Sequence, residues 1–212
     1  MKRLSTLEWM RIGYFGGSFD PPHRGHLHVA QAAAERFALE RVLLAPTGSQ
    51  PLKPDGPTAS FADRLSMVRL LVEAQKYVEA SEIDAPREDG APNYTVDTLV
   101  RLRETLDAKD DLFVVVGIDA FAEIRRWRDP ERLFELAQWI VVSRPGFDVA
   151  AVETLGLTRK EREQVHVMDD VAEDVSASAL RRMLAADEDV AAILPVRVLE
   201  FIRAHGLYGA SR

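Results

Sequence analysis

The sequence predicts one α/β domain built around a mainly parallel sheet with helices on both faces. Short apolar runs rich in β-branched residues alternate with amphipathic stretches of helical period along most of the 212 residues. A glycine pair ends the first apolar run, and a helical pattern follows it directly, as at a strand-to-helix turn. With 47% hydrophobic and 29% charged residues, the chain has the composition of a globular protein that can bury one sizeable core.

Strands and helices are expected to alternate in order along the chain. The strands are predicted at 11–15, 41–45, 77–81, 112–116, 138–143 and 164–168. The helical patterns between them lie at 26–37, 61–73, 96–106 and 130–137. Ser60, three residues before Asp63, predicts a capping box, and Asp129 before Pro130 predicts a capping carboxylate. Repeated strand–helix–strand units place successive strands in parallel, so the predicted fold is Rossmann-like and doubly wound.

The last quarter of the chain is predicted to be helical, with helices at 178–186 and 195–205. Gly206 would end the second helix as a C-terminal cap. We therefore expect a single domain over residues 1–212. Its α/β core would span about 11–170, and its helical part 171–212.

Two connections, 46–58 and 84–93, are longer than the roughly 2–6 residues usual in α/β folds. Ligands of open parallel sheets bind at the carboxyl ends of the strands. Long connections at that end are typical of binding loops.

Charge and composition limit the partners. A net charge of −7 argues against broad nucleic-acid binding, but it allows a small phosphorylated ligand held by a local group of donors. No apolar run approaches the roughly 20 residues of a membrane span, and the N-terminus lacks the apolar centre of a signal peptide. Without cysteine there is no disulfide, thiolate nucleophile or cysteine-based zinc site. We expect a cytoplasmic protein, either a monomer or a small homo-oligomer.

The junction at residues 16–26, GGSFDPPHRGH, carries the strongest chemical signal. Gly16 and Gly17 allow a tight turn and a close approach of the backbone to a ligand. A helix beginning near Gly25 would point its free N–H groups and positive dipole end at that turn, which predicts an anion site. The buried face of this helix is expected to consist of Leu27, Ala30, Ala34 and Phe37.

His23 and His26 stand three residues apart across the helix start and can face the same space. Imidazoles there can donate to phosphate oxygens and stabilise the charge that grows during phosphoryl or nucleotidyl transfer. A tight turn with surface histidines is the simpler alternative, and His28 is expected to be structural. A metal site would need a third ligand or a His-Glu-x-x-His pattern, and the sequence offers neither.

This junction resembles the (T/H)xGH signature of the nucleotidyltransferase superfamily and, in its full form, the bacterial nicotinate-nucleotide adenylyltransferase family. The resemblance implies joining ATP to nicotinate mononucleotide to give deamido-NAD and pyrophosphate, with Mg²⁺ assisting and no covalent enzyme intermediate. It implies that His23 and His26 are catalytic and contact the ATP phosphates, and that no protein side chain binds the metal. The implied ATP-binding residues of the junction are Gly16, Gly17, Ser18, Phe19 and Gly25.

Residues 174–181, DVSASALR, resemble the superfamily's second signature, ISxTxxR. They predict a helix start with the hydroxyls of Ser176 and Ser178 and with Arg181 one turn later. Such a start can accept a phosphate, which Arg181 would bind through paired donors. An ordinary serine cap with a solvated arginine is the alternative.

Three further segments resemble family elements that bind the second substrate. Residues 93–99, NYTVDTL, are similar to its YTxDTL segment, which implies that Thr95 meets the nicotinate carboxylate. Residues 117–119, GID, look like the family's GxD element, which implies that Asp119 holds a ribose or the loop around it. Residues 126–130, RWRDP, look like its W-x-x-P element, which implies that Trp127 stacks on the pyridine ring. A core aromatic is the alternative for Trp127.

Lys53 stands where the family commonly has a proline-flanked His-Lys, and Leu52 replaces the histidine. The resemblance implies that Lys53 supplies charge to a substrate phosphate. The five sequence elements that resemble the family run from Gly13 to Arg181, in the order found in the family.

Three other functions stay open at this stage. A sister adenylyltransferase would act on nicotinamide mononucleotide or phosphopantetheine. A non-catalytic nucleotide sensor would be expected to lose a histidine of the HxGH element, and this chain retains both. A metal-dependent hydrolase would need a carboxylate cluster around His23 and His26.

Overall fold

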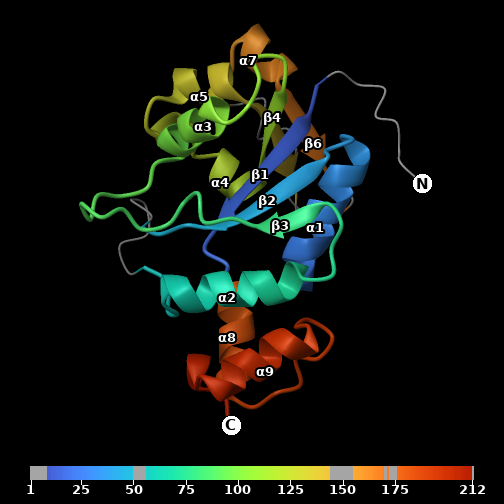
Figure 1. Ribbon diagram of the computed structural model, residues 1–212, viewed down its shortest axis with the longest axis vertical. Helices are drawn as coiled ribbons and strands as arrows, with labels where there is room; N and C mark the ends of the chain where they lie inside the picture. Colours follow the sequence, from blue (N-terminus) through green and yellow to red (C-terminus); the bar gives the residue numbers. More distant parts are fainter. Residues whose placement is uncertain (1–8, 50–55, 144–154, 170, 172–175, 212) are drawn as a thin grey trace.

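The computed structural model describes residues 9–49, 56–143, 155–169, 171 and 176–211. Its centre is a six-stranded sheet in the order β3-β2-β1-β4-β5-β6, and every neighbouring pair is parallel (Figure 1). The strands are β1 (Arg11–Gly17), β2 (Arg41–Pro46), β3 (Val78–Ala80), β4 (Asp111–Gly117), β5 (Gln138–Val142) and β6 (Val165–Met168). The strand order reverses between β1 and β4, so the crevice at their carboxyl ends is the expected ligand position.

All six predicted strands are confirmed, with ends that shift by at most two residues. β1 continues through both glycines because they still pair with β2, Gly16 with Ala45 and Gly17 with Pro46. The first glycines of the junction are therefore sheet residues, and the turn begins at Ser18.

The predicted helices are also confirmed to within two residues. They are α1 (Arg24–Arg36), α2 (Phe61–Val72), α3 (Thr95–Glu104), α5 (Pro130–Leu136), α8 (Ala177–Ala185) and α9 (Val196–Ala204). The sequence did not indicate the short elements α4 (Ile118–Phe121), η1 (Ile124–Arg126), α7 (Arg159–Glu163) and η2 (Leu207–Gly209). Elements of three to five residues are too short to show a helical period. No helix within the described ranges is long and apolar enough to cross a membrane.

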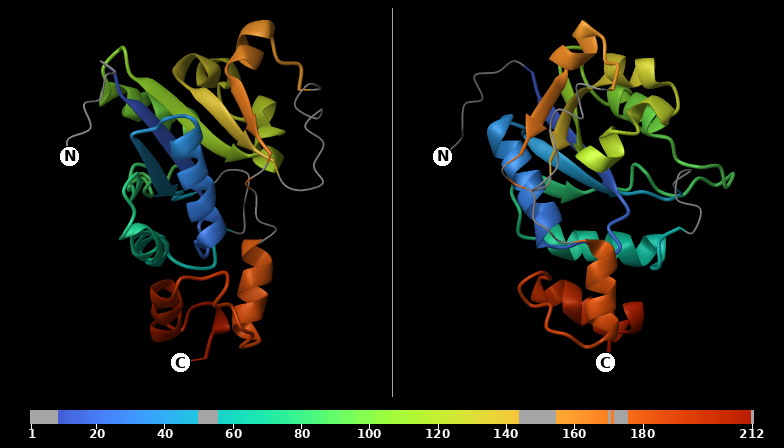
Figure 2. Two further views of the ribbon diagram at one scale, coloured as in Figure 1. Left: turned by 90° about the vertical axis from the view of Figure 1, so that its right-hand side faces the viewer. Right: turned by 180° about the vertical axis from the view of Figure 1, so that it is seen from behind.

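Helices cover both faces of the sheet, as a doubly wound fold requires. In β4, Phe113 and Val115 join the core cluster that contains buried residues of α1, α2, α8 and α9. Val114 and Val116 join the cluster that contains residues of α3, α4 and α5. This alternation follows the period of two along a strand. α8 and α9 lie below α2, away from the sheet (Figures 1 and 2).

The buried face of α1 was predicted in part. Ala30 and Ala34 are buried as expected, and Val29 and Ala33 join them. Leu27 and Phe37 are only partly buried, which corrects the prediction. These two residues lie toward the ends of α1, whereas the small residues of its middle pack against the sheet.

Of the three predicted helix ends, one is correct and one is correct in part. Gly206 follows α9 with φ +61°. The Ser60 hydroxyl oxygen accepts the Asp63 N–H at 3.1 Å, but the Asp63 carboxylate accepts the Ser60 hydroxyl and not the Ser60 N–H that a capping box requires. Asp129 is the residue before α5, but its side chain makes no capping hydrogen bond, so that prediction is wrong. Its φ of +52° is left-handed, whereas a capping side chain usually folds back from an extended residue.

Arg64 is a buried cation in α2 that fastens the loops at the carboxyl end of the sheet. Its side chain is 1% exposed and donates to three backbone carbonyls, those of Ser18 (2.7 Å), Thr47 (3.0 Å) and Ala59 (3.2 Å). Burial lowers the pKa of Arg64, and the nearby Asp20 opposes this shift. One guanidinium therefore joins the loop after β1, the loop after β2 and the start of α2.

Replacing Arg64 with methionine should destabilise the protein strongly. The variant Arg64→Met leaves three buried carbonyls without their donor, and we expect the free energy of unfolding to fall by about 3 kcal/mol or more in urea unfolding. Arg69→Met is the matched control, because Arg69 lies exposed on the same helix and pairs only at the surface with Glu82. The free energy of unfolding of Arg69→Met should fall by at most about 1 kcal/mol. Equal losses in the two variants would contradict the role given to Arg64.

Candidate active site

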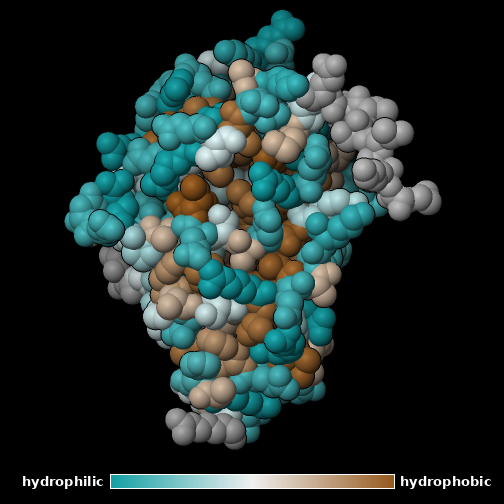
Figure 3. Space-filling model, in the orientation of Figure 1, coloured by the Kyte–Doolittle hydropathy of each residue, from teal (hydrophilic) through white to brown (hydrophobic). Residues whose placement is uncertain are grey.

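Two neighbouring cavities open at the carboxyl ends of the strands, and Thr47 lines both. The first cavity has a volume of about 270 Å³ and is lined by Ser18, Asp20, Thr47, Gly48, Gly56, Pro57, Ala177, Ser178 and Arg181. The second has a volume of about 560 Å³, and its lining includes Tyr14, Gly16, Asp84, Asn93, Tyr94, Thr95, Gly117, Asp119, Trp127 and Arg128. Seen from the side of Figure 1, the molecule shows apolar residues in the middle of its surface, and hydrophilic residues surround them (Figure 3).

The two glycines at the end of β1 leave room for aromatic side chains. A Cβ at Gly16 would lie 2.3 Å from the Tyr14 hydroxyl oxygen, and one at Gly17 would lie 3.3 Å from the Phe19 ring. Ser18 lines the first cavity and Gly16 the second. Phe19, a predicted ATP-binding residue, is 1% exposed as a whole and belongs to the core.

The two predicted catalytic histidines are brought together at the start of α1. Their ring centroids are 3.8 Å apart, and the backbone N–H of His23 donates to Nδ1 of His26 at 3.2 Å. Because Nδ1 of His26 accepts this hydrogen bond, the neutral ring carries its proton on Nε2 and can donate it to a ligand. His23 is buried, His26 is half-buried, and Gly25 is buried in the first turn.

Neither histidine lines the two cavities. His28 is exposed on the surface of α1 and lines neither cavity. Exposure makes His28 a useful reference for the other two histidines.

The second signature meets the first across the first cavity. Nη1 of Arg181 donates to the backbone carbonyl of Asp20 at 2.7 Å, and Nη2 donates to the Ser178 hydroxyl at 3.3 Å. The Ser176 hydroxyl oxygen accepts the Ala179 N–H at 3.1 Å and so caps α8. Ser176 thus caps α8 and is exposed outside the cavity lining, whereas Arg181 is half-buried and anchored at the cavity.

Asp20 is a site residue that the sequence analysis did not single out. The residue is 3% exposed, and its carboxylate accepts the backbone N–H groups of Thr58 (2.7 Å) and Ala59 (3.0 Å) and the Tyr208 hydroxyl (2.7 Å). Arg181 lies 3.6 Å from the same carboxylate. Burial, and then the hydrogen bond to Asp20, raise the pKa of Tyr208.

The predicted residues for the second substrate gather around the second cavity. Thr95 is the first residue of α3, and Asp119 is exposed in α4. Trp127 follows η1 and is half-buried, with its ring edge-on to Trp139 at 6.0 Å. Trp127 is therefore both a core contact and a wall of the cavity. Lys53 lies outside the described residues.

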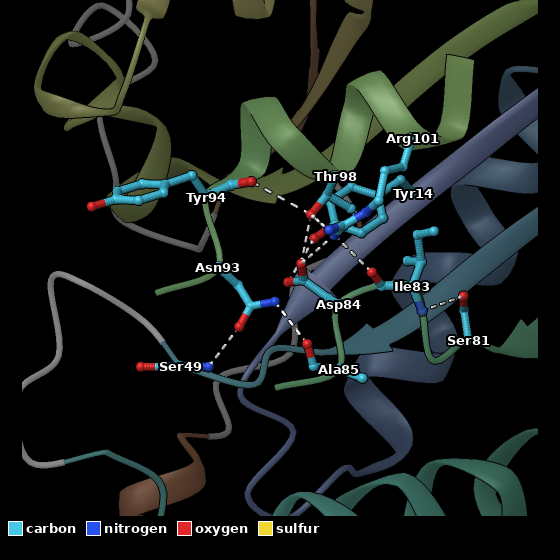
Figure 4. A network of polar contacts seen from close by, with 10 residues as sticks. All are labelled: Tyr14, Ser49, Ser81, Ile83, Asp84, Ala85, Asn93, Tyr94, Thr98 and Arg101. Atoms are coloured by element: carbon cyan, nitrogen blue, oxygen red, sulfur yellow. Dashed lines mark hydrogen bonds and ion pairs between the residues drawn. The ribbon is translucent and has the colours of Figure 1, made fainter. Parts of the chain in front are cut away.

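A second missed group, Asp84, lines this cavity and takes part in a network of polar contacts (Figure 4). The residue is 3% exposed, and its carboxylate accepts the hydroxyls of Thr98 at 2.6 Å and Tyr14 at 3.2 Å, with Arg101 at 3.9 Å. Burial raises the pKa of Asp84, although hydrogen bonds from Thr98, Tyr14 and Thr47 oppose the shift. Burial, and then the charge of Asp84, also raise the pKa of Tyr14.

Asn93 ties the two long connections together. Its side-chain oxygen accepts the Ser49 N–H at 3.1 Å, and its amide nitrogen donates to the Ala85 carbonyl at 2.9 Å (Figure 4). A Cβ at Gly48 would lie 2.5 Å from the backbone nitrogen of Pro86, so only glycine allows this approach. Both connections line the cavities, in agreement with the prediction that they are binding loops.

Two curated relatives match nearly the whole chain. Both are named "Probable nicotinate-nucleotide adenylyltransferase", and each is 38% identical to this chain. The protein from Desulfatibacillum aliphaticivorans matches over 94% of this chain and 100% of its own length, and that from Chromobacterium violaceum over 93% and 98%. The family model described as cytidylyltransferase-like matches residues 14–183. The chain belongs to the nicotinate-nucleotide adenylyltransferase family.

Solved structures agree with the fold of this adenylyltransferase family. The Plasmodium falciparum nicotinic acid mononucleotide adenylyltransferase complexed with NaAD has a TM-score of 0.76 at 17% identity, over 95% of this chain and 98% of that chain. The same enzyme complexed with APC has a TM-score of 0.74 at 16% identity. The resemblance inferred from residues 16–26 is confirmed, and so is the Rossmann-like fold.

Two carboxylates of this adenylyltransferase, Asp20 and Asp84, were missed although both line a cavity. A lone aspartate in a loop is usually solvated, so composition and spacing gave no signal for either. Their burial depends on partners far away in the sequence. Within the described part of the chain, no group of three or more His, Cys, Asp or Glu side chains could hold a metal ion.

The raised pKa of Asp84 predicts a pH-dependent contribution to stability. The ordinary value for this carboxyl is 3.8, and the folded value lies above it. Its contribution is then fully present below the unfolded pKa and is lost as the pH rises through the folded pKa. The free energy of unfolding of the wild type, relative to Asp84→Asn, should therefore fall in urea titrations as the pH rises above the unfolded pKa of 3.8.

Asp89→Asn is the control for this measurement. Asp89 is exposed, and its hydrogen bond with Arg87 lowers its pKa to about 2, so its titration lies below the range measured. The corresponding difference for Asp89→Asn should stay flat. A difference for Asp84→Asn that is also flat, or that grows with pH, would contradict the prediction.

Proposed function

We propose that this chain transfers the adenylyl group of ATP to nicotinate mononucleotide, giving deamido-NAD and pyrophosphate in NAD biosynthesis. The observation that carries the proposal is the pair of cavities that meet at Thr47. One is lined by the two signatures associated with ATP, and the other by Thr95, Asp119 and Trp127. The names of the curated relatives support the same reaction.

ATP is assigned to the first cavity and the adjoining start of α1. The backbone of Gly16, Gly17, Ser18 and Phe19 would follow the triphosphate, and the positive dipole end of α1, near Gly25, would add positive potential. From the other side, phosphate oxygens would accept hydrogen bonds from the hydroxyls of Ser176 and Ser178 and from the guanidinium of Arg181. Arg181 is suited to this because Asp20 already holds it at the cavity.

In this reaction a phosphate oxygen of nicotinate mononucleotide attacks the α-phosphorus of ATP, and the bond to pyrophosphate breaks. The substrate supplies the nucleophile, so the protein positions the two phosphates and stabilises the charge that develops. His23 and His26 are the proposed donors to the phosphate oxygens, with Nε2–H of His26 available as described above. ATP must extend beyond the first cavity to reach them, since neither ring lines it.

Nicotinate mononucleotide is assigned to the second cavity. Trp127 would stack on the pyridine ring, and Thr95 would meet the carboxylate with its hydroxyl and the N–H at the start of α3. Asp119 would accept from a ribose hydroxyl. Lys53, in the connection after β2, would add a positive charge for a phosphate.

Mg²⁺ is proposed to arrive with ATP and to be held by its phosphates. Among the described residues, the one carboxylate lining the first cavity is that of Asp20. It already accepts two N–H groups and a hydroxyl and lies beside Arg181, so it is poorly placed to bind a metal. When bound, the ion would neutralise charge on the departing pyrophosphate.

A comparison of second substrates tests the proposed function. Pyrophosphate release should be fastest with ATP and nicotinate mononucleotide, and slower by roughly 100-fold or more in kcat/KM with nicotinamide mononucleotide or phosphopantetheine. The difference is expected because a site built to bind a carboxylate leaves its donors unpaired with an amide. A better rate with either alternative would overturn the substrate assignment.

Alanine variants of the histidines test the catalytic roles. His23→Ala and His26→Ala should each lower kcat by roughly 100-fold or more, the usual effect of removing a donor to transition-state charge. His28→Ala is the control on the same helix and should keep the wild-type kcat, because His28 is exposed. His26→Ala also removes the acceptor for the His23 N–H, so folding should be checked by circular dichroism. Wild-type turnover in either of the first two variants would refute the assignment.

A further inference from the structure

Tyr208, near the end of the described chain, reaches the loop between β1 and α1, residues 18–23, which we call the phosphate loop. Its hydroxyl donates to Oδ1 of Asp20 at 2.7 Å, across 188 residues of sequence. Asp20 lines the first cavity and holds Arg181 with both its carbonyl and its carboxylate. The proposed function gives no role to the C-terminal turn, so this contact needs its own explanation.

The backbone around Tyr208 has an unusual conformation that places the tyrosine hydroxyl near Asp20. Tyr208 has φ +58°, a left-handed conformation that costs free energy for a residue with a side chain. Gly206 and Gly209 on either side are also left-handed, with φ +61° and +72°. A Cβ at Gly209 would lie 3.5 Å from Cβ of Ala185, so this turn lies against the end of α8, the helix that carries Arg181.

The donors on the two Asp20 oxygens show what the tyrosine contributes. Oδ1 accepts from Tyr208 and the Ala59 N–H, whereas Oδ2 accepts from the Thr58 N–H and faces Arg181. The tyrosine hydroxyl thus fixes the rotation of the carboxylate. It also takes up part of the negative charge that would otherwise draw Arg181 away from a phosphate.

We propose that Tyr208 is a positioning residue for ATP: through Asp20 it holds the Arg181 guanidinium and the phosphate loop in the geometry that binds the triphosphate. The inference rests on the proposed function only in placing the ATP phosphates in the first cavity. Tyr208 itself does not line that cavity. Its removal should therefore change ATP binding without removing a ligand contact.

The variant Tyr208→Phe keeps the ring and removes the hydroxyl. We expect the Kd of a non-hydrolysable ATP analogue, measured by calorimetry, and the KM for ATP to rise about 10-fold, the effect of losing one hydrogen bond to a charged group. The KM for nicotinate mononucleotide should change less than about 2-fold, because Tyr208 is absent from the second cavity. Tyr77→Phe is the matched control, since Tyr77 is exposed on another part of the fold, and it should bind the analogue like the wild type.

A double-variant cycle tests the route through Asp20. In the background of Asp20→Asn, adding Tyr208→Phe should weaken analogue binding by less than about 2-fold, since the charged acceptor is already gone. An unchanged Kd in Tyr208→Phe overturns the proposal. So does a full 10-fold effect in the Asp20→Asn background, and so does an equal loss for both substrates with a lower Tm. Analogue binding needs no second substrate, so a wild type that binds the analogue but does not use nicotinate mononucleotide refutes the proposed function and not this inference.

Discussion

A carboxylate with almost no access to water needs several donors, and Asp20 finds them on three separate parts of the chain. The segment before α2 supplies two backbone N–H groups, α8 supplies Arg181, and the C-terminal turn supplies Tyr208. An unpaired charge buried in this place would cost several kcal/mol, roughly, so the three parts must assemble for the loop to fold. The phosphate loop is therefore ordered by the protein itself before any ligand arrives, which is the condition for catalysis by positioning.

Arg64 and Arg181 lie near Asp20 with different tasks. Arg64 has a structural role. Its guanidinium donates to three backbone carbonyls, and none of its donors faces the solvent in the first cavity. Arg181 is half-buried, lines the cavity and keeps donors for a ligand. This division explains how a chain with a net charge of −7 can bind anionic substrates: the local arrangement of a few cations decides, not the total.

The helices, the strands and the site signatures were predictable, because each depends on residues that are close together in the sequence. β4 shows this, because a continuous apolar run is what a strand buried on both faces requires. Asp20 and Asp84 were not predictable, because their partners Tyr208 and Tyr14 lie 188 and 70 residues away and only the fold brings them together. α4 was missed because four residues show no period. The Asp129 cap failed because its φ depends on how the chain enters α5.

Adenylyl transfer also requires that the two cavities hold the two reacting phosphates in a fixed position relative to each other. An in-line displacement fails when the reacting atoms are misplaced by about 1 Å. The loops after β2 and β3 are joined by Asn93 and by the close approach at Gly48, while Tyr14 of β1 bonds to Asp84 in the lining of the second cavity. Two loops and the strand β1 are thus linked to one another, and Thr47 lies where the two cavities meet. A ligand in one cavity is consequently positioned by the same framework as a ligand in the other.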